Sequence, residues 1–403
     1  MEQIFTDHRT IQKYRSGPLG PYCQQLAERL HQQGYAREKA QRHLYTVDDF
    51  GRWLERRRIA VCDVSINHAQ RFLRLDQRTK KTGDRLALKY LFEMFAQEGR
   101  ISPMNTPMTE AELVVHEFGN YLNEERALAS PTIKNRRVIV RTFLAWKFGK
   151  KTVSLSNIEA PDLIGFMLEE TRRRTTFKDV RTALRSFIKY LVFTGSLTRD
   201  LSAAIPCAPN RRLVGIPRTL TADQVRRILA SCNRKNRIGR RDYAILLLLA
   251  RLGLRSGEVE GLKIDDVDWI TGNLTVHGKG GKVRQLPLLH DVGKAISAYI
   301  QKDRKSSADK RIFQRTTAPR QGLSRTVGSI VRFALERAGV KSHSQGAHQF
   351  RYSLASRMLA KGASLTEIGE VLRHESPNTT FIYTKVDLGA LRPLARRWPG
   401  GGL

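Results

Sequence analysis

Cysteine is scarce in this 403-residue sequence, and the four that occur lie far apart, at Cys23, Cys62, Cys207 and Cys232. No pair has the C-x-x-C spacing, and no histidine lies near them at a spacing suited to zinc. The small number and wide spacing of the cysteines argue against a domain stabilised by disulfides and against a zinc ribbon. We expect the four cysteines to be buried, reduced thiols.

Long apolar runs are absent as well. The longest, residues 243–250, is far shorter than the roughly 20 residues that a membrane-spanning helix needs. The first residues include Glu2, Asp7 and His8 and lack the apolar stretch of a secretory signal. The sequence therefore predicts a cytoplasmic chain without a membrane partner.

Acidic residues are few relative to basic ones. Asp and Glu number 38 against 71 Lys and Arg, which leaves a formal net charge of +33 and a pI near 10.6. Such a field attracts polyanions, and it favours nucleic acid as the partner. The alternative is a basic protein that is merely soluble or that touches anionic lipid. The 40% of apolar residues indicates a folded protein and not a disordered polycation.

The first two hundred residues have helical periodicity and contain a weak repeat. Three apolar residues recur 93 positions later: Val47, Phe50 and Trp53 return as Val140, Phe143 and Trp146. With small shifts, Val64, Phe72, Ala87, Leu88, Leu91, Phe95 and Gly99 correspond to Ile158, Phe166, Ala183, Leu184, Phe187, Leu191 and Gly195. We interpret the pattern as two similar helical units, over about 19–101 and 109–197. A chance match between amphipathic helices of similar length is the alternative.

Two Pro-containing stretches, residues 102–107 and 207–217, are typical of linkers. The basic residues of the second stretch could lie on phosphates, or the stretch could be a solvated hinge. With about 150 residues per domain, the length predicts two or three domains. We place an extra helical, DNA-binding-like domain at 1–105, a second helical domain at 108–205 and a third domain at 214–403.

The third domain combines helices with one predicted hairpin. Thr221-x-x-Gln224 has the pattern of a capping box at its start. Residues 273–277 and 283–288 have strand character and flank the turn Gly278-Lys279-Gly280-Gly281-Lys282. The turn leads into a strand and not a helix, so it is a basic hairpin tip and not a nucleotide-binding loop. The predicted fold class is α+β: mainly α with a small antiparallel β-hairpin or sheet.

Several polar residues of this domain together could stabilise a phosphodiester under nucleophilic attack. Arg255 lies three residues before Glu258, and His348-x-x-Arg351 places an imidazole and a guanidinium on one helix face. A phosphodiester under attack gains charge on its non-bridging oxygens, which two planar guanidiniums suit. Taken singly, each residue is explained as well by a surface pair or by core packing. The set as a whole predicts phosphodiester chemistry.

A nucleophile and an acid are also available. Tyr383 follows a predicted helix start, but a tyrosine is a poor nucleophile at neutral pH unless a base or cations help remove its proton. His348 is a candidate base. The departing oxygen needs a proton, and Lys279 at the hairpin tip could deliver it.

In motifs and spacing, this third domain resembles the catalytic domain of the tyrosine recombinase (phage integrase) family. The resemblance rests on five boxes in order, which makes it highly specific. They are Ala250–Glu258 for the first arginine, Gly278-Lys279-Gly280 with Lys282 and Pro287 for the hairpin lysine, His348-x-x-Arg351, Leu372-Arg373-His374, and Thr379-Thr380-x-x-Tyr383.

The resemblance implies that Tyr383 attacks the scissile phosphate to give a 3′-phosphotyrosyl link and a free 5′-hydroxyl. It further implies roles for the other boxes: Arg255, Arg351 and His374 stabilise the phosphate, Lys279 is the general acid, His348 assists proton transfer and Glu258 supports the site. Residues 109–197 resemble the core-binding domain of the family. No cofactor and no metal are expected. The implied partner is double-stranded DNA, bound by a homo-oligomer that is expected to be a tetramer, and other recombinases are a further candidate partner.

The sequence departs from the family pattern at four positions: Phe350, Tyr352, Arg373 and Lys385. Arg373 stands where the family usually has Gly, and we hypothesise that its charge and that of Lys385 alter phosphate contacts or regulation. The tail after Tyr383 is predicted either to dock on a neighbouring protomer or to fold back.

The extra N-terminal unit favours integration or transposition of a mobile element over chromosome resolution. A type IB topoisomerase-like activity and a noncatalytic DNA-binding protein are the alternatives.

Overall fold

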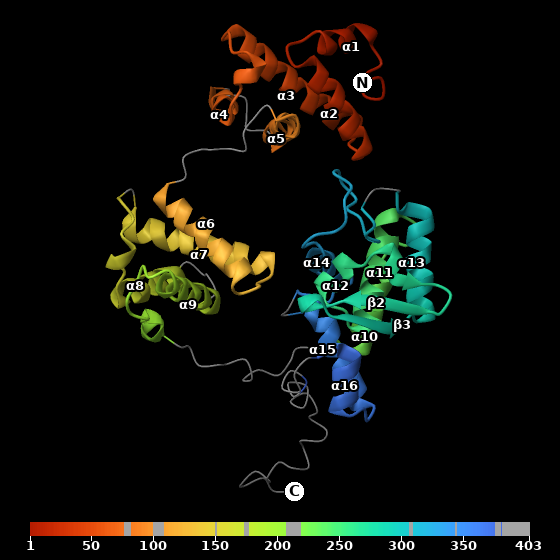
Figure 1. Ribbon diagram of the computed structural model, residues 1–403. Coiled ribbons are helices and arrows are strands. Elements are labelled where there is room, and N and C mark those ends of the chain that lie inside the picture. The colour runs from red at the N-terminus through yellow and green to blue at the C-terminus, as the bar shows by residue number, and fades with distance from the viewer. Residues whose placement is uncertain are drawn as a thin grey trace. The chain divides into compact units, whose positions relative to one another are not determined.

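The computed structural model describes residues 1–75, 82–99, 109–149, 151–172, 177–206, 219–305, 309–342, 345–374 and 380 (Figure 1). It is mostly helical and contains one three-stranded antiparallel sheet, which confirms the predicted fold class. The chain forms two compact units, residues 1–101 together with 213–403, and residues 102–212. Residues 1–95, 115–205 and 220–350 build separate apolar clusters. The three-domain division stays a prediction.

Residues 1–99 form a helical bundle. Its helices are α1 (His8–Arg15), α2 (Gly20–Gln32), α3 (Arg37–Arg56), α4 (Ile66–Leu75) and α5 (Thr82–Gln97). The apolar stripe of α3 is fully buried at Leu44, Val47 and Phe50, and it packs against α2 and α5. Burial of this stripe holds the bundle together, because each such side chain contributes about 1.5–3 kcal/mol when removed from water.

The unit of residues 102–212 is a second helical bundle. It contains α6 (Glu110–Glu124), α7 (Ser130–Phe148), α8 (Ala160–Arg172) and α9 (Phe177–Phe193). The Thr109 hydroxyl accepts a hydrogen bond from the Glu112 N–H at 3.2 Å and thereby caps α6. Val115, Phe118, Val140 and Phe187 are fully buried between the helices.

The aromatic residues of the sequence repeat pack in the same way in both bundles. Phe50 stacks on Trp53 with ring centroids 5.9 Å apart, and Phe143 stacks on Trp146 at 6.4 Å. In each bundle the phenylalanine also makes an edge contact with a ring of the following helix, Phe72 at 5.2 Å and Phe166 at 5.3 Å. This agreement in three dimensions favours two similar helical units over a chance match of helix lengths.

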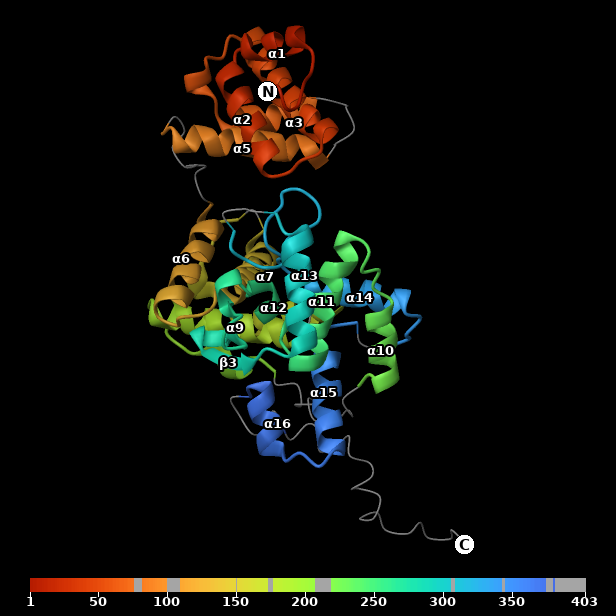
Figure 2. The same ribbon diagram turned by 90° about the vertical axis from the view of Figure 1, so that its right-hand side faces the viewer.

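Residues 219–374 contain the remaining helices and the sheet. The helices are α10 (Ala222–Ala230), α11 (Arg237–Leu252), α12 (Ser256–Gly261), α13 (His290–Asp303), α14 (Val327–Arg337), α15 (His348–Ala360) and α16 (Leu365–Leu372). The apolar helix α11 packs against α10, α13, α14 and α15 (Figure 2). The predicted capping box is present, since Thr221 and Gln224 bond reciprocally at the start of α10.

The sheet has the order β1 (Val267–Asp268), β2 (Asn273–His277) and β3 (Val283–Pro287). The predicted hairpin is formed by β2 and β3, and its register pairs Asn273 with Pro287 and His277 with Val283. The turn between them is closed by the Gly278 N–H, which donates to the Lys282 carbonyl at 2.7 Å. Strand β1 is not evident from the sequence, because two residues are too short to show an alternating pattern.

The expectation that all cysteines are buried is wrong for Cys62. Cys23 and Cys232 are buried free thiols, and burial raises the pKa of Cys23 to about 12. Cys62 is a free but exposed thiol, because it lies in the short 3₁₀ segment Val61–Asp63, which buries none of its residues. Cys207 lies outside the described residues. In the part of the chain that is described, no helix has the length and apolarity to cross a bilayer.

Candidate active site

Arg255 lies at the junction between α11 and α12. Helix α11 ends at Gly253, whose left-handed backbone (φ +57°) turns the chain, and the buried Leu254 then leads to Arg255 at the N-cap of α12. The Arg255 backbone N–H donates to Glu258 Oε2 at 2.9 Å, and its Nη1 donates to Glu258 Oε1 at 2.6 Å. The predicted Arg255–Glu258 pair is therefore present, and both the backbone and the side chain of Arg255 are held.

Arg351 lies on the first turns of α15 and is 3% exposed. Its Nη1 donates to the Gly253 carbonyl at 2.6 Å, and its Nη2 donates to the Leu372 carbonyl. These two carbonyls lie at the C-terminal ends of α11 and α16, where helix carbonyls have no partner within the helix. The negative ends of two helix dipoles therefore stabilise the buried Arg351 cation.

The two arginines converge on one turn. Arg255 Nη2 donates to the Arg373 carbonyl at 3.4 Å, and Arg351 bonds the adjacent carbonyl of Leu372. The next residue along the chain is His374. Three of the predicted site residues, which come from distant parts of the sequence, thus meet at the end of α16.

Glu258 is the carboxylate of this cluster and is only 4% exposed at its side chain. Besides Arg255 it pairs with Arg373, whose Nη2 lies 3.0 Å from Glu258 Oε2. Burial alone would raise the pKa of Glu258, but the Arg255 N–H bond and the charges of Arg373 and Arg255 outweigh burial and lower the pKa below 4.5. Glu258 is therefore an anion that supports two guanidiniums.

His374 is held at its backbone and its ring. Its N–H donates to the Gly369 carbonyl at 2.9 Å, and its Nδ1 lies 2.8 Å from Thr380 Oγ1. Burial, and then the charges of Arg351, Arg255 and Arg373, lower the pKa of His374 to about 4. The ring is therefore neutral at physiological pH and carries one N–H that can donate to an anion.

His348 occupies the first turn of α15, three residues before Arg351. Although its side chain still reaches solvent, partial burial together with the charges of Arg351 and Arg255 lowers the pKa of His348 below 6.5. A neutral imidazole at this position can accept a proton, which suits the role predicted for His348.

Two of the predicted residues cannot be placed in the same way. Lys279 lies in the short 3₁₀ segment Lys279–Gly281 at the hairpin tip, and only its backbone is described. Tyr383, Lys385 and the tail that follows lie outside the described residues. The roles assigned to Lys279 and Tyr383, like those of the other predicted site residues, stay predictions.

Two contacts of the site are not evident from the sequence. The Arg373 head group is paired with Glu258, and the Thr380 hydroxyl is paired with His374. Both residues lie inside motif boxes, but their partners are 115 and 6 positions away, and a spacing pattern does not show which side chains meet.

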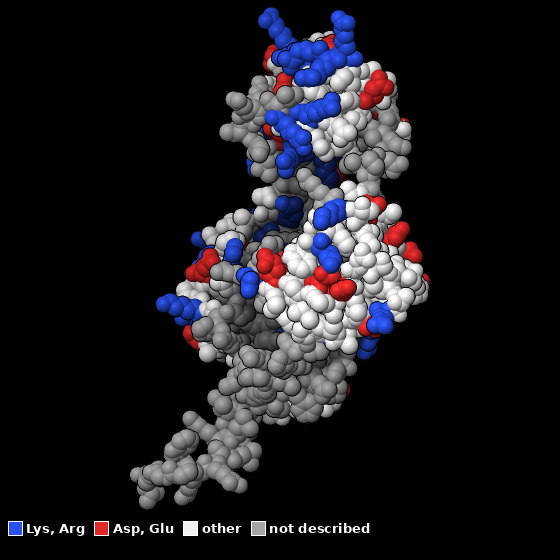
Figure 3. Space-filling view, turned by 90° about the vertical axis from the view of Figure 1, so that its left-hand side faces the viewer, with Lys and Arg blue, Asp and Glu red and all other residues white. Residues whose placement is uncertain are grey.

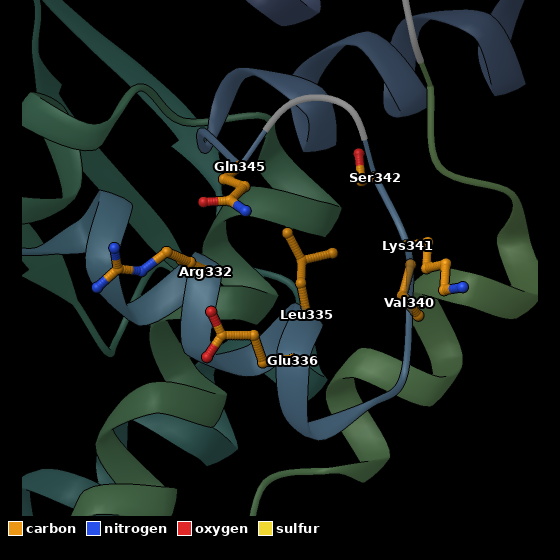
Figure 4. Close-up of a pocket in the computed structure, with 7 residues that line it drawn as sticks. All are labelled: Arg332, Leu335, Glu336, Val340, Lys341, Ser342 and Gln345. Carbon is orange, nitrogen blue, oxygen red and sulfur yellow. The ribbon is translucent and has the colours of Figure 1, made fainter.

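Within the described ranges, no group of three or more His, Cys, Asp or Glu side chains is arranged to hold a metal ion. A pocket of about 330 Å³ lies between the end of α14 and the segment that follows it (Figure 4). It is lined by Arg332, Leu335, Glu336, Val340, Lys341, Ser342 and Gln345, and none of these is a predicted site residue.

Basic side chains are prominent outside this cluster as well. Figure 3 shows Lys and Arg gathered on residues 1–99, the uppermost part of that view. Arg56, Arg57 and Arg58 follow one another there at the end of α3 and are exposed. In residues 213–403, Lys and Arg number 34 against 15 Asp and Glu. The excess charge that the sequence predicts to attract polyanions is thus present in both regions.

Comparison with known proteins agrees with the motif boxes. The profile described as "Phage integrase family" matches residues 218–389. A Sinorhizobium fredii (strain NBRC 101917 / NGR234) protein, named as an integrase/recombinase, is 42% identical over 391 residues, which cover 95% of each chain. The tyrosine recombinase XerD of Listeria monocytogenes (serotype 4b, strain F2365) is 29% identical over 281 residues, 68% of this chain and 94% of XerD.

Among solved structures, the XerH site-specific recombinase bound to its palindromic difH substrate is similar in fold. The TM-score is 0.54 at 22% identity, and the match covers 73% of this chain and 91% of XerH.

Proposed function

Because this chain belongs to the phage integrase family of tyrosine recombinases, we propose that it is a site-specific recombinase that cleaves and rejoins DNA strands through a 3′-phosphotyrosyl intermediate. The observation that carries the proposal is the convergence of Arg255, Arg351 and His374 on the end of α16. Two guanidiniums and a neutral imidazole N–H in one place suit a phosphate that gains negative charge during attack.

The proposed reaction uses the predicted residues as follows. The Tyr383 phenol oxygen attacks the scissile phosphorus while His348 accepts the phenol proton. The bond from phosphorus to the 5′-oxygen breaks, and Lys279 donates a proton to that oxygen. The 5′-hydroxyl of another strand then attacks the phosphotyrosine and returns its proton to Lys279, while the departing Tyr383 oxygen takes back the proton held by His348. Each step exchanges one phosphate ester for another, so the chemistry is balanced without an external energy source.

Arg255 and Arg351 differ in what they can offer the phosphate. Arg351 is almost fully buried and held by two carbonyls, so it supplies a fixed charge. The Arg255 side chain is 35% exposed, so part of its guanidinium fork can face the phosphate. Glu258 keeps the Arg255 side chain in place for that contact.

We propose double-stranded DNA as the substrate. The net charge of +33 favours DNA binding, and XerH, similar in fold, is solved on its DNA substrate. We propose residues 108–205 as the core-binding domain and residues 1–105 as an extra DNA-binding domain. The similar aromatic packing of the two bundles supports a shared origin for them.

Exchange between two duplexes requires cleavage of four strands, which a tetramer with one Tyr383 in each subunit would provide. We therefore propose a homotetramer on DNA, with another recombinase as a candidate partner. The biological role that we favour is integration or transposition of a mobile element. The similarity over 95% of an integrase/recombinase chain, which includes the extra N-terminal residues, supports this preference.

A plasmid assay tests recombination against simple relaxation. The substrate is a supercoiled plasmid that carries two copies of the DNA segment bound specifically by the protein, and a one-copy plasmid is the control. Recombination predicts deletion or inversion products with the two-copy plasmid and none with the control. Relaxation of both plasmids without rearranged products would favour the topoisomerase-like activity instead.

A further inference from the structure

Arg373 adopts a backbone conformation that is unfavourable for its residue type. It is the C-cap residue of α16 and has φ +56° and ψ +49°, in the left-handed region. Glycine is the usual residue at such helix ends, because a side chain in this conformation is strained against the backbone. An arginine at this position therefore needs a compensating interaction of its side chain.

The side chain of Arg373 provides that interaction by turning inward. It is only 8% exposed, its Nη2 lies 3.0 Å from Glu258 Oε2, and its Nη1 donates to the Val371 carbonyl at 3.2 Å. Loss of the Arg373 guanidinium would leave the buried Glu258 carboxylate with Arg255 as its partner but with one charged hydrogen bond fewer. The guanidinium thus faces Glu258, and any effect of its charge on phosphate contacts, as hypothesised from the sequence, would act through this carboxylate.

Glu258 connects Arg373 to Arg255. Its Oε2 accepts from Arg373 and from the Arg255 backbone N–H, and its Oε1 accepts from Arg255 Nη1. A second connection runs through the backbone, since the Arg373 carbonyl accepts from Arg255 Nη2 at 3.4 Å. Arg255 is therefore fixed by Arg373 through a carboxylate on one side and through a carbonyl on the other.

We propose that Arg373 is a positioning residue for strand cleavage, which holds the Arg255 guanidinium against the scissile phosphate and ties it to the turn that carries His374. This role rests on the proposed function. This role would explain why an arginine stands at a backbone position that favours glycine.

The test compares full-length wild type with Arg373→Gly, Arg373→Lys and Arg255→Ala. The substrate is a nicked duplex that the wild type binds specifically and on which it forms a covalent adduct. Glycine suits the left-handed backbone, so Arg373→Gly is expected to fold and to bind the duplex as wild type does. Its rate of adduct formation at saturating DNA should fall about 10- to 100-fold, the usual effect of losing a hydrogen bond to a charged group. The rate of adduct formation should fall less for Arg373→Lys than for Arg373→Gly, because lysine keeps the positive charge.

A neutral substrate separates positioning from a merely structural role. A methylphosphonate in place of the scissile phosphate carries one negative charge less, both before and during attack. The stabilisation that Arg255 provides then matters less, so the defects of Arg255→Ala and Arg373→Gly should shrink together. In addition, the double variant Arg373→Gly, Glu258→Gln should form the adduct no more slowly than Glu258→Gln alone. The reason is that the Arg373 side chain acts on Arg255 through the Glu258 carboxylate, so its loss has no further effect once that carboxylate is gone.

Three results would overturn the proposal. The first is cleavage by Arg373→Gly at the wild-type rate, and the second is an Arg373→Gly defect that is as large on the methylphosphonate as on the phosphate. The third is a double variant whose loss of rate equals the product of the losses for Arg373→Gly and Glu258→Gln. Absence of any adduct with the wild type on DNA that it binds specifically would instead contradict the proposed function itself.

Discussion

The hydroxyl of Thr380 lies 2.8 Å from Nδ1 of His374. Since the pKa of His374 is lowered to about 4 by burial and by Arg351, Arg255 and Arg373, only one ring nitrogen carries a proton at neutral pH. If the hydroxyl donates to Nδ1, the proton stays on Nε2, which can then donate to the phosphate. The partner of one ring nitrogen thus sets what the other can do.

We expect Thr380→Val to slow adduct formation about tenfold. Without this hydrogen bond, neither the orientation of the His374 ring nor the nitrogen that carries its proton is fixed. Binding of the nicked duplex should be unchanged. Thr380→Ser keeps the hydroxyl and serves as the matched control, so it should cleave at close to the wild-type rate. Equal rates for Thr380→Val and wild type would show that this hydroxyl does not orient His374.

Gly253 is predicted to tolerate no side chain. Its φ is +57°, and an added Cβ would lie 2.7 Å from Leu372 Cδ2 and 3.1 Å from Leu354 Cδ2. We expect Gly253→Ala to lower the free energy of unfolding by about 2 kcal/mol or more, through backbone strain and overpacking. Gly257→Ala is the control, because an added methyl there would meet nothing within 4 Å and the φ of Gly257 is not positive. Urea unfolding of both variants checks this, and equal stabilities would refute it.

The repeat predicts similar energetic roles for Phe50 and Phe143. Both are fully buried and contact a tryptophan and a phenylalanine of their own bundle. Each Phe→Ala change should cost about 3–5 kcal/mol, and the loss should be confined to the bundle concerned. Hydrogen exchange resolved along the chain measures this. Phe193→Ala, at a side chain that is 65% exposed, should cost under about 1 kcal/mol. A large loss at one site and none at the other would argue against equivalent bundles.

The lowered pKa of His374 predicts how stability depends on pH. In the unfolded chain the ring takes up a proton near pH 6.5, but in the folded chain only near pH 4. Between these values the unfolded state binds more protons, so stability falls as the pH is lowered from 6.5 towards 4. Because the ring is only half-buried, solvent screening reduces the effect to about 1–2 kcal/mol.

His374→Gln should remove this part of the pH dependence. Urea unfolding at pH 7 and pH 5 gives the difference in stability, which should be smaller for the variant than for wild type. His290→Gln, at an exposed position at the start of α13, is the control. An equal change in both variants would contradict the neutral state of the half-buried His374 ring.

The parts of the fold that can be predicted from the sequence are those set by local chemistry. The capping box at Thr221, the hairpin around Gly278–Lys282 and the glycine that ends α11 each depend on residues a few positions apart. The predicted residues Arg255, Arg351 and His374 also meet at one turn, as the motif spacing suggests.

What could not be predicted are contacts between distant segments. The Arg373–Glu258 pair joins residues 115 positions apart, and the left-handed backbone of Arg373 contradicts local preference. The Arg351 bonds to the Gly253 and Leu372 carbonyls depend on how two helix ends meet in space. Local propensity is overridden there by tertiary packing, which a single sequence does not display.

Covalent trapping tests the central claim most directly. Duplexes that tile the DNA flanking the gene are screened for specific binding, and the duplex that is bound is then nicked near successive positions. Wild type and Tyr383→Phe are incubated with it and analysed under denaturing conditions. We predict a protein–DNA adduct at the 3′-phosphate side of the cleavage point with wild type and none with Tyr383→Phe. No adduct on DNA that the protein binds specifically, or an equal adduct with Tyr383→Phe, would contradict the assignment of this chain as a recombinase with Tyr383 as its nucleophile.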